Sequence, residues 1–151
     1  MDAVTYPNAA VIEYIEQNHV PLKVPHDQQP LAGDFNVKWT PTLVVLDQEG
    51  KEHHRTVGFL SPEEFIPSLL LGIGITHFDH DTFDKALACF DRVLSEYATS
   101  DAAPEAVYQR GVTLYKSSGS SQALKGAYER LAAQYPASEW TKKAYPYRLI
   151  S

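Results

Sequence analysis

The chain has 151 residues, enough for one ordinary domain or two small ones, and its 44% apolar and 21% charged residues are a normal globular balance. The net charge of −6 argues against a nucleic-acid partner, which would require a basic face for the phosphates. No apolar run approaches the roughly 20 residues that span a bilayer, so we expect no membrane partner. The single cysteine, Cys89, excludes an internal disulfide framework and a cysteine-rich zinc site.

The acidic charge is concentrated in the first part of the chain. Residues 1–66 carry four basic and ten acidic residues, whereas residues 67–151 carry nine of each. This shift predicts a boundary near residue 66.

The first 36 residues predict two helices with an extended segment between them. Residues 9–18 follow Asn8, a favourable N-cap, and carry apolar residues at helical spacing. Residues 20–24 alternate apolar and polar side chains, which predicts a short strand. Residues 29–35 predict a short helix, and Asn36 is suited to the left-handed conformation that would end it.

A hairpin and a capped helix are predicted next. Residues 43–46 form a continuous apolar run, which favours a strand buried on both faces. Residues 47–50 predict a turn with a positive φ at its glycine, and residues 52–59 predict the returning antiparallel strand. Ser61 and Glu64 then have the spacing of a capping box at the start of a helix.

This order of elements resembles the last two-thirds of the thioredoxin fold, over about residues 1–72. The resemblance is carried by Asn36-Val37, Thr40-Pro41-Thr42-Leu43, Gly50 and Val57-Gly58. In that family the proline at the place of Pro41 follows a cis peptide bond, and the main chain before it can pair with an extended substrate segment. The resemblance therefore implies substrate contacts at Trp39, Thr40 and Pro41.

The resemblance also concerns the start of the chain. Residues 1–7, together with residues 11–24, resemble the stretch after a C-x-x-C-x-x-M redox motif, so that Met1 falls at the methionine. We therefore expect the chain to be truncated, with both cysteines upstream. The alternative is a family member that lost its first strands and either pairs residues 20–24 with 43–46 or dimerises. An unpaired sheet edge would favour self-association, whereas a monomer would indicate that the strands have re-paired.

The second half predicts a run of helices separated by short polar turns. They begin at Ser61 and continue over residues 82–97, 104–116, 122–135 and 139–145. Gly74 and Ala86 recur 37 residues later as Gly111 and Ala123, close to the tetratricopeptide period of about 34. The segments 106–119 and 128–140 resemble tetratricopeptide repeats, although Arg110 stands where an apolar residue is usual.

We therefore predict an α/β then all-α fold. Residues 1–66 would form an incomplete thioredoxin-like sheet with flanking helices, and residues 67–151 a tetratricopeptide-like helical array. Because only about two repeats are present, the helix starting at Ser61 is expected to belong to both parts. The repeat pattern implies a protein-binding groove, although an ordinary interhelix core fits the same six residues: Leu71, Ile75, Phe78, Tyr108, Val112 and Tyr115.

Other chemistry is weakly supported by the sequence. Cys89 lies beside an apolar stripe without a basic neighbour, which favours a packing role. His77 and His80 could share a helical face, but we interpret them as part of a polar turn. His53 and His54 are adjacent in a predicted strand, so we expect them on opposite faces and at the surface. We predict no catalytic residue, no metal site and no cofactor.

Two functions remain. The chain as given would be a protein- or peptide-binding module, since without a C-x-x-C pair it has no dithiol chemistry. The alternative is that the full-length parent is a thiol–disulfide oxidoreductase whose helical array docks its partner. The start shows no signal peptide, which favours the cytoplasm over the periplasm.

Overall fold

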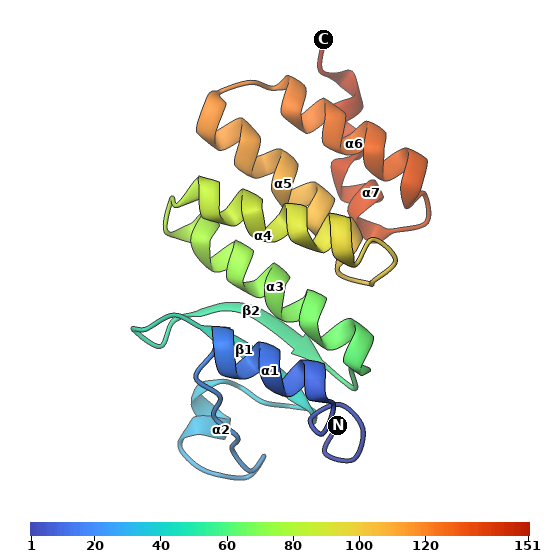
Figure 1. Ribbon diagram of the computed structural model, residues 1–151. Helices are drawn as coiled ribbons and strands as arrows, with labels where there is room; N and C mark the ends of the chain where they lie inside the picture. The colour runs from blue at the N-terminus through green and yellow to red at the C-terminus, as the bar shows by residue number, and fades with distance from the viewer.

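The computed structural model describes all 151 residues (Figure 1). The first part consists of helix α1 (Ala9–Asn18), the single-turn helix α2 (Leu31–Asp34) and strands β1 (Thr42–Leu46) and β2 (Glu52–Val57). The second part is helical throughout. Its elements are α3 (Pro62–Asp79), α4 (Phe83–Glu96), α5 (Ala103–Ser118), α6 (Gln122–Gln134), α7 (Glu139–Ala144) and the 3₁₀ helix η1 (Tyr145–Leu149).

Local signals in the sequence place several of these elements correctly. Helix α1 begins after Asn8, whose side chain accepts hydrogen bonds from the amides of Ala10 and Val11 at 3.0 and 3.3 Å. Asn36 follows α2 with a φ of 47°, and Gly50 turns the hairpin with a φ of 83°. In both turns the residue type matches the left-handed conformation that the backbone requires.

The predicted strand over residues 20–24 is wrong. These residues have no regular secondary structure and make no backbone hydrogen bond, and Val20 and Leu22 are 98% and 80% exposed. Alternating apolar residues form a strand only when a neighbouring strand satisfies their N–H and C=O groups. β1 pairs only with β2, so the segment has no partner.

The sheet is a two-stranded antiparallel hairpin, in which Thr42 lies opposite Val57. Helix α3 packs against both strands, and no other helix contacts them. The prediction that β1 is buried on both faces is therefore wrong: Leu46 is 41% exposed and the rest of the strand is half-buried. The register shifts between Val45, opposite His54, and Leu46, opposite Glu52. His53 is thus the extra residue of a β-bulge.

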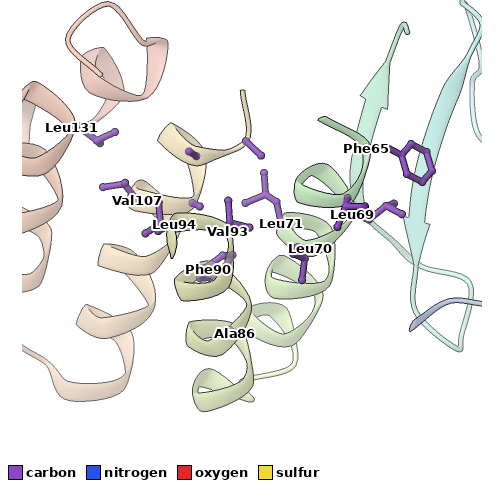
Figure 2. Packing of buried hydrophobic residues seen from close by; sticks show 14 of the residues in the cluster. Phe65, Leu69, Leu70, Leu71, Ala86, Phe90, Val93, Leu94, Val107 and Leu131 are labelled. Carbon is purple, nitrogen blue, oxygen red and sulfur yellow. The ribbon is translucent and has the colours of Figure 1, made fainter. Parts of the chain in front are cut away.

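The core lies in the helices. It is a cluster of 18 buried hydrophobic residues, five of them on α3: Phe65, Ile66, Leu69, Leu70 and Leu71. No strand residue belongs to it, although Leu43 and Val45 pack against it. Figure 2 shows it running from Phe65 beside the sheet, through Phe90 on α4, to Leu131 on α6. Helix α3 therefore joins the sheet to the helical part, and the boundary expected near residue 66 falls inside it.

The helices from α3 to α6 stack in chain order, each packing on the next. Small residues allow the close approaches. A Cβ added at Gly74 would lie 2.5 Å from the Phe90 ring, and one at Gly111 would overlap the Ala127 side chain. Gly74 and Phe90 lie 37 residues before Gly111 and Ala127, respectively. The same glycine contact is thus made twice.

Helix α3 begins at Pro62 as predicted, but its capping box is absent. Ser61 makes no side-chain hydrogen bond to the helix amides. Glu64 instead accepts a hydrogen bond from the amide of Asp101 at 2.9 Å, because the α4–α5 loop lies beside this helix end. None of the helices combines the length and the apolarity needed to cross a membrane.

Candidate functional site

The loop before β1 presents Trp39 and Thr40 to solvent. The Thr40–Pro41 peptide bond is cis, and Trp39 is 69% exposed. The Thr42 hydroxyl donates to the Trp39 carbonyl at 2.6 Å, and the Gly58 amide donates to the Pro41 carbonyl at 2.8 Å. These bonds fix the loop while leaving its outer face accessible.

A shallow pocket of about 230 Å³ lies on this loop. Its lining comprises His26, Val37, Lys38, Trp39 and Thr40. One exposed aromatic side chain, that of Trp39, therefore borders the pocket, next to the cis bond before Pro41.

The expected groove residues of α3 differ in accessibility. Leu71 is only 2% exposed and belongs to the core, so it offers no surface to a partner. Ile75 and Phe78 are half-buried. The ammonium group of Lys116, near the end of α5, lies 5.0 Å from the centroid of the Phe78 ring. This contact places the C-terminal ends of α3 and α5 side by side.

The expected groove residues of α5 also fall into two groups. Tyr108 packs against the C-terminal elements: its ring lies 5.1 Å from that of Trp140, and its hydroxyl lies 3.0 Å from the Tyr147 hydroxyl. Val112 is half-buried and Tyr115 is 42% exposed. We call Ile75, Phe78, Val112 and Tyr115 the array face, because these four keep exposed surface without an aromatic neighbour from α7 or η1.

A cluster of histidines and carboxylates, which the sequence analysis missed, lies where the hairpin meets the end of α3. The His53 Nε2 atom lies 2.8 Å from Asp47 Oδ2, and its Nδ1 atom lies 2.6 Å from Asp79 Oδ2. His80 Nε2 lies 3.3 Å from the same Asp47 oxygen. The side chain of His53 is fully buried, and that of Asp47 is 5% exposed.

The carboxylates and the imidazole of His53 in this cluster stabilise each other's charged forms. Hydrogen bonding to His53 lowers the pKa of Asp47 to about 2, against the opposing effect of burial. Burial by itself would lower the pKa of His53, but the hydrogen bonds to Asp47 and Asp79 outweigh it, and the pKa is raised. The cluster therefore favours a charged imidazole between two carboxylates.

The expectation that His53 and His54 lie on opposite faces and at the surface is wrong. His53 contacts Asp79 at the end of α3, and His54 lies against Gly72 of the same helix. The β-bulge at His53 interrupts the alternation of side chains and turns its imidazole toward α3. A bulge leaves no periodic signal that could have revealed this from the sequence.

Two further expectations concern His77 on α3 and Cys89 on α4. His77 bonds the Thr82 hydroxyl at 3.0 Å and does not reach the cluster, so His80 is not its partner. Cys89 is half-buried, and burial raises the pKa of its thiol. It is therefore not an activated thiolate.

Comparison with known proteins covers part of the chain. The family model of a thioredoxin-like domain matches residues 4–71, a stretch that extends from before α1 to the middle of α3. No curated protein and no solved structure matches the chain. The loop with Trp39, the hairpin and its bulge all lie inside the matched stretch, whereas all four residues of the array face lie outside it. Residues 4–71 are therefore similar to a thioredoxin-like domain.

Proposed function

We propose that this chain is a protein- or peptide-binding module in which a tetratricopeptide-like array, α3 to α7, presents the array face to its partner. The observation that carries this proposal is the repeated close packing, Gly74 on Phe90 and Gly111 on Ala127, at an interval of 37 residues. In a tetratricopeptide-like array, helix pairs related in this way line one face of the stack with their first helices, here α3 and α5. Contact between α3 and α5 supports this arrangement.

The side chains of the array face suit an extended partner segment. Phe78 and Tyr115 supply aromatic surface, and Val112 and Ile75 supply aliphatic surface. Aromatic side chains dominate the binding free energy of many protein interfaces when a partner covers them. The Lys116 ammonium group beside Phe78 adds a positive charge for a carboxylate of the partner.

The thioredoxin-like part would have a non-catalytic role. Thiol–disulfide exchange by a dithiol requires a second thiolate to resolve the mixed disulfide. Cys89, the only cysteine, lies on α4 with a raised pKa and has no neighbouring thiol. The domain instead anchors α3, the first helix of the array, through the hairpin.

Selection from a displayed library of random peptides tests the proposal. We expect peptides that bind the wild-type chain and lose about tenfold or more in affinity with Tyr115→Ala, since truncating an aromatic hot-spot residue costs roughly 2 kcal/mol or more. The matched control is Tyr145→Ala, a tyrosine 52% exposed on η1, which should bind as the wild type does. Peptides whose affinity is unaffected by Tyr115→Ala would contradict the proposal.

A thiol–disulfide oxidoreductase is the second candidate, and the exposed Trp39–Thr40 segment before the cis bond to Pro41 favours it. This segment could pair with an extended substrate near a disulfide. The chemistry would require a C-x-x-C pair from outside these 151 residues. Reduction of insulin disulfides by this polypeptide separates the candidates. We expect no acceleration over dithiothreitol alone, and measurable turnover would contradict the binding-only function.

A further inference from the structure

Three side chains at the junction of the hairpin and α3 bring possible metal-binding atoms close together. Asp47, His53 and His80 each offer one ligand atom, and these atoms lie within 4.8 Å of one another. We propose that they bind a divalent transition-metal ion of the zinc class, through Asp47 Oδ2 and the Nε2 atoms of His53 and His80. This proposal does not depend on the proposed binding function.

The spacing of the donors fits such an ion. Zinc binds imidazole nitrogen and carboxylate oxygen at about 2.0–2.2 Å, which puts tetrahedral ligands about 3.3 Å apart. Asp47 Oδ2 lies 2.8 Å from His53 Nε2 and 3.3 Å from His80 Nε2. All three donor atoms lie within 4.8 Å of one another, so the imidazole of His80 would have to move toward that of His53 to complete the site. His80, with 44% of its side chain exposed, has the room to do so.

The two buried ligands are held in place by neighbouring groups. The other carboxylate oxygen of Asp47, Oδ1, accepts hydrogen bonds from the amides of Glu49 and Lys51 at 3.0 and 2.9 Å. Oδ2 is thereby left to face the histidines. Asp79 holds Nδ1 of His53, as carboxylates commonly do for metal-bound histidines. A metal ion would displace the proton that His53 Nε2 shares with Asp47, while Nδ1–H still donates to Asp79, and the lone pair of Nε2 would then bind the ion.

The donor types select the metal. Two imidazoles and one carboxylate suit zinc and its transition-metal neighbours, whereas calcium and magnesium require oxygen ligands. Three protein ligands leave a fourth position for water or for a ligand from solvent. Since Asp47 and His53 belong to the hairpin and His80 follows α3, the ion would tie the sheet to the first array helix.

Titration of the untagged, EDTA-dialysed full chain with zinc chloride tests the site by calorimetry. We expect one ion per chain and a higher melting temperature with zinc than with EDTA, because a ligand of the folded state stabilises it. His80→Ala should weaken zinc binding by about 100-fold or more, and Asp79→Asn by about 10–100-fold, as found for residues that orient ligands. Magnesium chloride should give no such binding.

His77→Ala is the matched control, because His77 lies on the last turn of α3 yet bonds Thr82 and not the cluster. It should bind zinc as the wild type does. Circular dichroism of each variant separates lost ligands from lost folding, and visible absorption of bound cobalt gives a second readout that His80→Ala should abolish. The proposal would be overturned if the wild-type chain did not bind zinc, or bound it at a ratio other than 1:1. It would also be overturned if His77→Ala weakened zinc binding as much as His80→Ala does.

Discussion

Single glycines set how closely the helices of the array approach one another. Gly111 on α5 faces Ala127 of α6, with the Ala123 carbonyl also in contact range. Gly126, one residue before Ala127, points into open space. A methyl group added at Gly111 would therefore overlap a neighbour, whereas one added at Gly126 would not, although both glycines lie within helices.

Replacing each glycine with alanine should separate packing from helix propensity. Gly111→Ala should destabilise the fold by roughly 1–3 kcal/mol, because the added methyl overlaps its neighbour. Gly126→Ala should stabilise it by about 0.5–1 kcal/mol, because only the backbone becomes less flexible. Urea denaturation measures both. If Gly111→Ala is as stable as Gly126→Ala, the close α5–α6 packing is contradicted.

His19 makes stability depend on pH. Its imidazole packs 5.7 Å from the Tyr14 ring, and its Nε2 atom is buried without a hydrogen-bond partner. Burial lowers the pKa of His19 below 6.5. Between that lowered value and 6.5 the unfolded chain binds the proton more tightly, so stability should be lost as the pH falls below about 6.5.

The variant His19→Phe keeps a ring in place but removes the titration. Its urea midpoint, measured with EDTA, should therefore fall less between pH 7.5 and pH 5 than that of the wild type. The remaining histidines are common to both proteins, and their contributions cancel in the comparison. An equal or larger fall in the variant would show that His19 is not buried in its neutral form.

At the scale of elements, helices are predicted best, because their signals are local. Asn8 caps α1, Pro62 starts α3, and the apolar stripe of α4 needs no knowledge of distant residues. Residues 20–24 fail because a strand depends on its partner. The cluster at His53 fails because it requires a bulge and a contact between residues 26 positions apart, His53 and Asp79.

Hydrogen exchange should show the same difference between elements. Amides of residues 20–24 should exchange at nearly unprotected rates, since they make no backbone hydrogen bond. Amides around Leu69 in the buried middle of α3 should be among the slowest. Mass spectrometry of peptic fragments resolves both segments. Protection of residues 20–24 equal to that of β2 would mean that the segment is paired in solution.

At the scale of the whole molecule, the chain is a stack that begins with α1, α2 and the small sheet and ends with α6, α7 and η1 (Figure 1). The edge of β1 that faces away from β2 has no strand beside it. An open edge with apolar residues is a template for pairing with another strand. A second copy of the chain could supply that strand.

We therefore expect concentration-dependent self-association in analytical ultracentrifugation. Leu46→Lys should shift the chain toward the monomer, because it places a charge on the open strand. Leu149→Lys, at a 72% exposed position on η1, is the control and should leave the association unchanged. A wild-type chain that stays monomeric at all concentrations would contradict the open edge.

The most direct test of the binding function is NMR chemical-shift mapping of the labelled chain with a selected peptide. The function proposed above predicts that the perturbed amides cluster on α3 and α5, around Phe78, Val112 and Tyr115. Perturbations confined to the loop at Trp39 and Thr40, with α5 unchanged, would contradict it and would place recognition on the thioredoxin-like domain.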